Sequence, residues 1–347
     1  MTTSLYQNYL QAKQQHPEKY ARDLAKVLNI SEAELLHARV GQDAVRLNGD
    51  IRALLAALEN VAETKAITRN EHAVHEHLGS YQNQHLSGHA GLILNPYALD
   101  LRLFLNQWHS VFALTEESKR GTRYSIQFFD GYGDAVHKVY NTDNTNMDEW
   151  HKVVTLFTQQ DNPALELSVN NPAESSEENV IDSKAIDSEW RAMTDVHQFF
   201  NLLRKHGVTR QQAFHAVDGD LAQRVDNQAL RQLLQMAKND QNEIMVFVGN
   251  RGCVQIFTGK IEKIMPHEEW LNIFNKKFVL HLIETDIVES WITRKPTKDG
   301  HVTSLELFSH DGTQIAQLYG QRTEGQPEQQ KWRDQIETLL QQQMVFA

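Results

Sequence analysis

His197 is the first side chain in this sequence whose type and position suggest chemistry. It lies about one helical turn after Met193 and shortly before Phe200, at the margin of an apolar helical stripe. An imidazole at such a margin is either a hydrogen-bonded boundary residue or a metal ligand that binds through one ring nitrogen. The residues alone leave both interpretations open.

Arg102 is the second candidate. It shares one face of a strand-like segment with Phe104, while the leucines of segment 101–105 occupy the opposite face. If both faces are covered, an arginine beside an aromatic ring is suited to bind an anion or the oxygen atoms of a ligand. The alternative is an ordinary surface arginine whose stem lies over its neighbours.

A third group follows Trp291 near the end of the chain and consists of Arg294, Lys295, Tyr319 and Arg322. In an acidic protein, such a basic and phenolic set could hold carboxylates through charge-assisted hydrogen bonds. Equally, these could be solvated charges at the ends of strands.

The elements that must position these side chains occur twice. Segment 305–319 repeats segment 126–140, and segment 280–282 repeats 101–103, with the same offset in residue number. Solenoid repeats run roughly 20–50 residues, so this much longer period indicates a duplicated domain. Positions where the copies differ are candidates for the working site. A loose alignment places Tyr6 opposite His197, so that the second copy alone carries an imidazole there.

Each copy is expected to place its helices before its strands. Apolar residues recur at three- and four-residue spacing in segments 5–36 and 190–203, with a break at Pro17, a capping box from Ser31 to Glu34, and Gly207 as a helix stop. The apolar sides are predicted to be Tyr9, Leu10, Tyr20, Leu24, Leu28 and Leu35 in the first copy, and Trp190, Met193, Val196, Phe200 and Leu203 in the second.

Period-two alternation follows the helices in both copies, and Asp-Gly turns at 130–131 and 311–312 separate the strands as hairpins would. These patterns predict an α+β fold, a tandem structural duplication with two antiparallel β-sheets, each with packed helices. Segment 159–187 has no sustained periodicity and Lys184 as its only basic residue. We therefore expect a first repeat at 1–158, an acidic linker at 159–187 and a second repeat at 188–347.

Composition narrows the classes of function. The 347 residues are 40% hydrophobic and 23% charged, without an apolar run near the roughly 18–20 residues of a membrane span. Residues 1–7 lack the basic and apolar regions of a secretory signal, so a cytoplasmic protein is expected. Cys253 is the sole cysteine of the sequence, which excludes an internal disulfide and a CxxC pair. A net charge of −11 argues against nucleic acid as the main partner.

Segment 21–35 has the pattern of a helix-turn-helix, with Asn29-Ile30-Ser31 as the turn. In a DNA reader, the second helix would present its exposed side to base edges. The basic residues that follow it are few and stand beside Glu32 and Glu34, so two packed helices with ordinary spacing are the favoured interpretation.

Longer blocks of the sequence resemble a known family. Residues 191–200, 242–257, 289–300 and 317–327, together with Asn83-Gln84-His85-Leu86, Gly91 to Pro96 and Asn106-Gln107-Trp108, resemble the HemS/ChuS/ShuS/HmuS family of bacterial cytoplasmic haem-handling proteins. The resemblance covers nearly the whole chain except the linker. It implies haem as ligand or substrate, in a cleft between the two halves.

The resemblance also implies roles for individual residues. A histidine of the second half ligates the haem iron in that family, and an arginine of the first half's sheet approaches the distal side. The matching residues here are His197 and Arg102, while Lys295, Tyr319 and Arg322 match residues that hold the propionates and the pocket, with Arg210 a weaker match. The partner that orients the histidine ring is not identified by the sequence. His75 and His85 do not occupy the place of His197, so one tight haem site per chain is expected.

Two functions fit this set of residues. One is a haem-degrading enzyme that opens the macrocycle and releases iron with an external electron donor or peroxide. The other is a carrier that receives haem from an inner-membrane importer and passes it on. A DNA-binding regulator that uses the segment 21–35 is a distant third.

Overall fold

The computed structural model describes residues 4–88, 90–118, 121–168, 181–323 and 325–344. The chain forms two compact units. Unit 1 consists of Met1–Arg69, Glu76–Asn171 and Asn250–Gln255, and unit 2 consists of Asn70–His75, Pro172–Gly249 and Ile256–Ala347. Each unit therefore holds most of one repeat.

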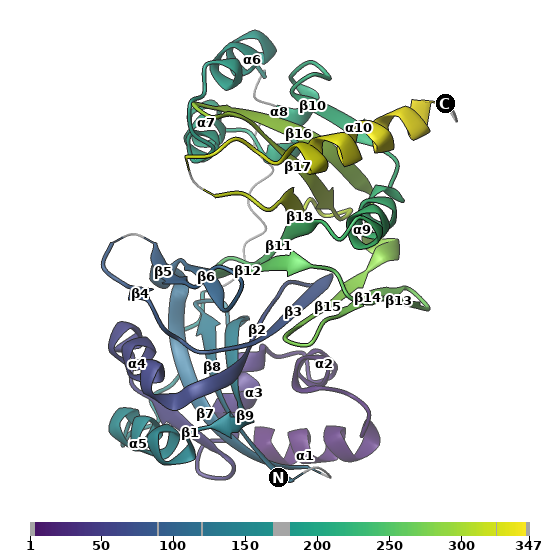
Figure 1. Cartoon of the computed structure of the whole chain (residues 1–347). Helices are drawn as coiled ribbons and strands as arrows, with labels where there is room; N and C mark the ends of the chain where they lie inside the picture. Colours follow the sequence, from purple (N-terminus) through teal and green to yellow (C-terminus); the bar gives the residue numbers. More distant parts are fainter. Residues whose placement is uncertain (1–3, 89, 119–120, 169–180, 324, 345–347) are drawn as a thin grey trace. The chain divides into compact units, whose positions relative to one another are not determined.

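The first repeat begins with helices and continues with strands (Figure 1). Its elements are α1 (Leu5–Gln15), α2 (Ala21–Val27), α3 (Glu32–Ala38), β1 (Ala44–Leu47), α4 (Ile51–Ala57), η1 (Leu58–Val61), β2 (Ala62–Arg69), β3 (Ala73–Gly79), β4 (Gln84–His85), β5 (Gly91–Leu94), β6 (Asp100–Leu103), η2 (Leu105–Gln107), β7 (Trp108–Ser118), β8 (Gly121–Asp130), β9 (Ala135–Thr145) and α5 (Met147–Phe157).

The second repeat has nearly the same order of elements. They are α6 (Ser183–Arg191), α7 (Gln198–His206), α8 (Arg210–His215), β10 (Ala222–Val225), α9 (Ala229–Asn239), β11 (Glu243–Gly249), β12 (Cys253–Lys260), β13 (Ile264–His267), β14 (Trp270–Phe274), β15 (Phe278–Ile283), η3 (Glu284–Asp286), β16 (Glu289–Thr297), β17 (Gly300–Phe308), β18 (Gln314–Gly320) and α10 (Gln330–Met344). This agreement confirms the predicted duplication and the α+β class.

The strands within each unit pair antiparallel. Unit 1 contains the order β1-β7-β8-β9-β2, and unit 2 contains the equivalent order β10-β16-β17-β18-β11. Each unit also contains a smaller antiparallel ladder, which is β4-β5-β6 in unit 1 and β13-β14-β15 in unit 2. Arg102 lies on β6, and Lys295, Glu306 and Tyr319 lie on β16, β17 and β18.

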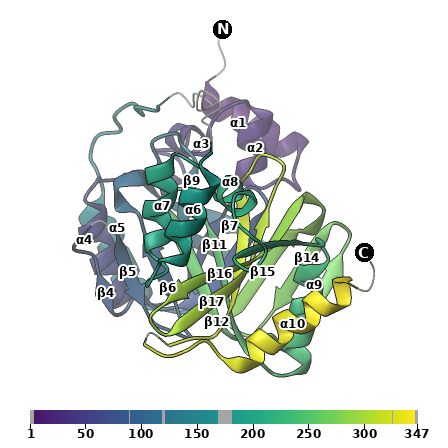
Figure 2. The ribbon, with the colours of Figure 1, turned by 90° about the horizontal axis from the view of Figure 1, so that it is seen from above.

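The two faces of the unit 2 sheet differ in chemistry because side chains alternate along a strand. Ile292, Leu305 and Leu318 point to one face, where they pack in a core with residues of α9 and α10. The opposite face carries Trp291 and Phe308, which pack with α6, α7 and α8. Figure 1 and Figure 2 show these three helices gathered together, apart from α9 and α10.

The helical predictions are partly wrong. The expected continuous helix from Trp190 to Gly207 is two helices, since α6 ends at Arg191 and α7 begins at Gln198. Asp195 accepts a hydrogen bond from the backbone amide two residues later, and a polar side chain that binds its own backbone in this way competes with helix. Consequently Phe200 is 64% exposed, while Phe199 is buried. The stop at Gly207 is confirmed, with φ of 61°.

In the first repeat, Leu10 and Tyr20 were predicted to lie on the apolar side but are exposed, whereas Tyr9, Leu24 and Leu35 are buried. The Ser31 to Glu34 capping box is confirmed. Helix α6 begins at Ser183, within the segment assigned to the linker, and residues 169–180 of that segment lie outside the described residues.

Candidate functional site

A stripe of polar side chains crosses the helix-covered face of the unit 2 sheet. Thr293 pairs with Ser304, and Ser304 pairs with Tyr319, so these three lie in one row across β16, β17 and β18. Glu306 and Gln317 form a neighbouring row. Burial of such groups costs free energy unless they are paired, and here they hydrogen-bond to one another.

The Glu306 carboxylate is the centre of this stripe and has no exposed side-chain surface. It accepts hydrogen bonds from Lys295 Nζ at 2.6 Å, from Arg210 Nε at 3.0 Å and from Gln314 Nε2 at 2.6 Å. Arg210 reaches the carboxylate from the first turn of α8, and its guanidinium also lies 5.1 Å from the centre of the Phe199 ring. One acidic and two basic groups leave this buried cluster with one excess positive charge.

The cluster shifts the pKa of each member in a direction that follows from its charges. Burial alone would raise the pKa of Glu306, but Arg210 and Lys295 hold it well below its usual range. Burial is the main cause that lowers the pKa of Lys295 to about 8, and the Arg210 charge adds to it while Glu306 opposes it. Burial, followed by the Glu306 charge, raises the pKa of Tyr319 above its ordinary value.

His197 lies at the N-cap of α7, with 86% of its side chain exposed. Its Nδ1 is 2.7 Å from Oδ1 of Asp195, and the same oxygen accepts the His197 backbone N–H at 2.8 Å. Both contacts hold the pKa of Asp195 below its usual value. A carboxylate on Nδ1 fixes the ring orientation and leaves Nε2 as the nitrogen that can bind a metal ion.

Arg322 and Phe200 belong to the same unit as His197. The positive charge of Arg322 contributes to the lowered pKa of Asp195, after the larger effect of the His197 hydrogen bonds, and it opposes the burial that raises the pKa of Tyr319. Among the described residues, its Nε is a buried donor without a hydrogen-bond partner. Phe200, three residues after His197, adds an exposed aromatic ring.

Unit 2 thus contains five of the six residues to which the family resemblance assigns a role. Lys295 and Arg210 both contact Glu306 directly. The neutral phenol of Tyr319 donates to Gln317 in the neighbouring row of the stripe. The charge of Arg322 acts on both Tyr319 and Asp195, which holds the His197 ring. These placements do not test the roles assigned to the residues, which stay predictions.

Arg102, the sixth, belongs to unit 1. Its guanidinium forms an ion pair with Asp100 and donates to the Leu101 carbonyl at 3.3 Å. Asp100 is only 3% exposed, and burial raises the pKa of its carboxyl while Arg102 opposes the rise. About a third of the Arg102 side chain is exposed, so the guanidinium is anchored and still accessible.

Comparison of the two repeats shows where their chemistry diverged. The element order pairs α7 with α2, so the position that corresponds to His197 lies at the start of α2, at Tyr20 by the helix caps or at Lys19 by the hydrogen bonds that end the two helices. The alignment of Tyr6 with His197 is therefore wrong, because Tyr6 lies in α1, which corresponds to α6. The conclusion that the second repeat alone carries an imidazole at this position still holds.

The polar stripe diverged as well. At the offset that relates the two repeats, the positions of Lys295 and Glu306 are occupied by Glu116 and Gln127 in the first repeat. The excess positive charge of the stripe in unit 2 is thus specific to the second repeat.

Asp195 and Glu306 are the functional candidates that sequence reasoning missed. Asp195 could have been found, because an Asp side chain frequently accepts a hydrogen bond from the backbone amide two residues later, which here belongs to His197. Glu306 gave no local signal, since its partners are 11 and 96 residues away along the chain.

The helix-turn-helix pattern corresponds to α2 and α3, but α3 has little free surface for DNA. Its Ala33, Leu35 and Leu36 are buried, and Glu32 is 5% exposed and paired with Lys138. The geometry therefore supports the interpretation of two packed helices.

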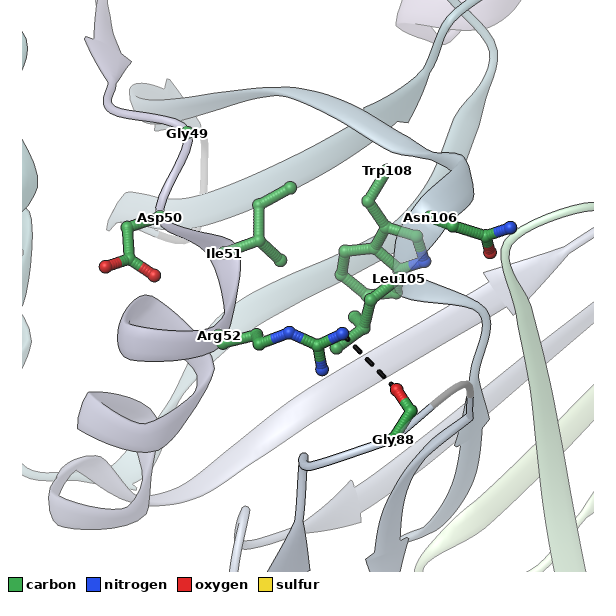
Figure 3. A pocket seen from close by; sticks show the side chains of 8 residues that line it. All are labelled: Gly49, Asp50, Ile51, Arg52, Gly88, Leu105, Asn106 and Trp108. Carbon is green, nitrogen blue, oxygen red and sulfur yellow. Dashed lines mark hydrogen bonds between the residues drawn. The ribbon is translucent and has the colours of Figure 1, made fainter.

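One further hollow lies in unit 1, with a volume of about 340 Å³ (Figure 3). It is lined by Gly49, Asp50, Ile51, Arg52, Gly88, Leu105, Asn106 and Trp108. Figure 3 shows Arg52 extended across it toward Gly88, whose carbonyl accepts a hydrogen bond at 3.4 Å. None of the residues predicted from the sequence lines this hollow. Separately, the helices of the described ranges include none that is long and apolar enough to span a membrane.

Comparisons with known proteins agree with this architecture. A family model described as a haemin-degrading HemS.ChuX domain matches twice, at residues 29–157 and 207–339. The hemin transport protein HmuS of Yersinia pestis is 67% identical over 340 residues, which is 98% of each chain. The structure of the heme degrading enzyme ChuS from Escherichia coli O157:H7 is 61% identical with a TM-score of 0.92, and the match covers 96% of this chain and 98% of ChuS.

A further solved structure is holo-PhuS, a heme-binding protein from Pseudomonas aeruginosa. It is 42% identical with a TM-score of 0.93, over 96% of this chain and 98% of PhuS. The chain therefore belongs to the HemS.ChuX family and carries two copies of its domain.

Proposed function

We propose that this protein binds haem through His197 and degrades it by oxidative opening of the macrocycle, which releases iron. The observation that carries the proposal is the pair formed by His197 and Asp195. Nδ1 of the imidazole lies 2.7 Å from a carboxylate oxygen of Asp195, although the His197 side chain is otherwise exposed. Histidines that bind metal ions almost always have such a partner on the other ring nitrogen.

The surroundings of His197 fit the remaining chemistry of haem. Phe200 offers an exposed aromatic surface to a flat apolar macrocycle. The excess positive charge of the Lys295, Arg210 and Glu306 cluster, with the unpartnered Nε of Arg322, suits the two carboxylates of the propionates. The names of the relatives support the same ligand, because they describe hemin transport, heme degradation and heme binding.

The residues of this chain would divide the work as follows. Asp195 accepts a hydrogen bond from Nδ1–H and so orients the ring with Nε2 as the nitrogen directed to iron. Arg102, anchored by Asp100, would donate hydrogen bonds to a small oxygen ligand, because a guanidinium has donors and no acceptor. Haem supplies the iron and the redox chemistry, while the protein orients and polarises. Electrons would come from an external donor.

The alternative is a carrier that receives haem from an inner-membrane importer and passes it on. The high exposure of His197 favours this alternative, since an accessible ligand can be transferred between proteins. In either case we propose a cytoplasmic protein that acts in iron acquisition.

Haem titration followed by turnover separates these functions. The parent, His197→Ala and Arg102→Ala are titrated without oxygen and then given oxygen, a reductant and catalase, while the Soret band is recorded. Because His267 is an exposed histidine on β13, His267→Ala is the matched control and should behave like the parent.

Loss of the Soret band over many turnovers, with iron and a bilin-like product, supports the enzyme. A band that persists in the parent supports the carrier. Normal haem binding by His197→Ala would show that the site itself is assigned incorrectly.

A further inference from the structure

One position of the sheet holds a half-buried carboxylate in the second repeat and a buried hydroxyl in the first. In unit 2, Glu289 on β16 pairs with Phe308 on β17. In unit 1, Ser110 on β7 pairs with Phe129 on β8. Phe129 and Phe308 are related by the offset of the two repeats, so Ser110 and Glu289 are structurally equivalent.

An arginine stands beside this position in both repeats. Arg46 pairs with Phe112 in the register of β1 and β7, and Arg224 pairs with Trp291 in the register of β10 and β16. Phe112 follows Ser110 by two residues, and Trp291 follows Glu289 by two residues. Each aromatic side chain therefore lies on the same face of its strand as Ser110 or Glu289. The Arg46 guanidinium lies 4.7 Å from the centre of the Phe112 ring.

A histidine is also present in both repeats. Helices α3 and α8 each begin with a capping box, at Ser31 and Thr209, and His37 and His215 each follow that cap by six residues. The two histidines are therefore equivalent. In unit 1, the charge of Arg46 helps to lower the pKa of His37 after the larger effect of burial, so the two side chains are close to each other.

The second repeat satisfies this set of donors with its own carboxylate. Glu289 accepts from Trp291 Nε1 at 2.8 Å and lies 3.8 Å from His215 Nε2. Gln211 and the charge of Arg224 also stabilise the ionised carboxylate, and together these groups hold the pKa of Glu289 below its usual value despite partial burial.

The first repeat keeps the arginine and the histidine without the acid. Within the part of the chain that the structure describes, Nε and Nη1 of Arg46, Nδ1 of His37 and Oγ of Ser110 are buried without a hydrogen-bond partner. Buried donors of this kind carry a desolvation cost of roughly 1–3 kcal/mol each, and more when charged. Arg46 and His37 occupy positions whose equivalents lie beside a carboxylate, and Ser110 occupies the position of that carboxylate. The unpartnered atoms of these three side chains point to an anionic ligand.

We propose that the first repeat binds a small monocarboxylate between Arg46, His37 and Ser110, where the second repeat places the side chain of Glu289. Arg46 and His37 are each partly exposed at other atoms, so the buried atoms of the site lie close to the surface. The part of the glutamate side chain that serine lacks is comparable in size to formate or acetate.

The charge of the site selects a monoanion. Arg46 contributes one positive charge. Burial, followed by the charge of Arg46, lowers the pKa of His37, while a side-chain hydrogen bond with Asn162 and the charge of Glu34 oppose this shift only in part. His37 therefore adds no positive charge at pH 7, and Arg46 is the cation that the site offers, with the Glu34 carboxylate held in the Ser31 cap.

Two donors of the second repeat are missing from the first. Ala33 stands in place of Gln211, and Phe112 stands in place of Trp291. Binding is therefore expected to be weak and reversible, in contrast to the permanent carboxylate of Glu289.

Acetate titration at constant ionic strength, with chloride as the replaced anion, tests the proposal. The readouts are the Nε–H resonance of Arg46 in NMR spectra, assigned by its loss in Arg46→Lys, and the thermal midpoint. We expect a saturable resonance shift and a midpoint that rises with acetate concentration, as ligand binding to the native state requires.

Ser110→Glu supplies the missing carboxylate from within and should remove the acetate dependence of both readouts. Glu289→Ser should create a second site with the same dependence in unit 2. Arg224→Met, in which the second repeat retains Glu289, is the matched control for Arg46→Met and should keep the parent's acetate response.

The proposal is overturned if acetate gives no saturable shift, or if inorganic phosphate or chloride shifts the Arg46 resonance equally. An unchanged acetate response in Arg46→Met would overturn it too. This variant decides the question even if Ser110→Glu fails to fold.

Discussion

Glu306→Gln tests whether the buried stripe of unit 2 is held together by charge. Glutamine keeps the volume of the side chain, so no cavity forms, but it removes the negative charge shared by Lys295 and Arg210. Removal of one member of a buried ion pair typically costs about 3–5 kcal/mol, because the remaining charge stays buried without compensation. For a domain of 150–250 residues, this corresponds to a fall of about 6–20 °C in the thermal midpoint.

The size of the effect depends on how Lys295 responds. Its pKa is already lowered to about 8, and loss of the carboxylate lowers it further. Lys295 can therefore release its proton in the variant, which brings the expected loss toward the lower end of the range. Arg210 cannot do so and stays charged.

The assay is thermal and urea denaturation near pH 7, followed by circular dichroism. Addition of Lys295→Met to Glu306→Gln should recover part of the loss, since it removes one uncompensated cation.

The pH dependence of this stabilisation has a defined sign. The folded pKa of Glu306 is lowered, so its stabilisation is complete above the unfolded value of about 4.3 and is lost as the pH falls toward the folded value.

The difference between parent and variant should accordingly shrink below about pH 4. A variant within about 1 kcal/mol of the parent at pH 7, with no recovery on Lys295→Met, would refute the view that charge holds this stripe together.

Three further predictions concern single residues. Asp195→Asn should weaken haem binding roughly 10–100-fold in a spectroscopic titration, since it disturbs the orientation of a metal-binding histidine. Asp187→Asn, in which the altered carboxylate pairs with Arg191 instead, should leave binding unchanged, and equal affinities of the two variants would contradict the role of Asp195. Burial lowers the pKa of His137 to about 3, so the folded state disfavours the protonated form, and stability should fall as the pH drops from about 6.5 toward 3. The free energy of unfolding of His137→Gln, measured in urea, should depend less on pH than that of the parent. The same pH dependence in both proteins would exclude His137 as the cause. Gly133→Ala should destabilise the protein by roughly 1–3 kcal/mol in urea denaturation, because φ is +85° and the new Cβ would collide with the side chain of Ser31. At Gly49 a new Cβ meets no neighbour within 4 Å, so Gly49→Ala should change stability little.

The sequence alone determined the features of the fold that rest on short-range patterns and on internal similarity. The constant offset between the matching segments predicted the duplication, and the change from helical to period-two spacing predicted the α+β class. The capping box at Ser31 and the stop at Gly207 were also predictable, since each depends on residues within one helical turn. The positions of His197, Arg102 and the basic set came from the resemblance to a family and from residue type.

The tertiary structure decided what these residues contact. The sequence does not show that Lys295 and Arg210 share the Glu306 carboxylate, because the three are brought together by strand register and by helix α8. Register also shows that Ser110 corresponds to Glu289, which leaves Arg46 and His37 of the first repeat without the carboxylate that the second repeat supplies. The break before His197 belongs here as well, because an Asp195 side chain that binds a backbone amide overrode an apolar spacing that predicted continuous helix.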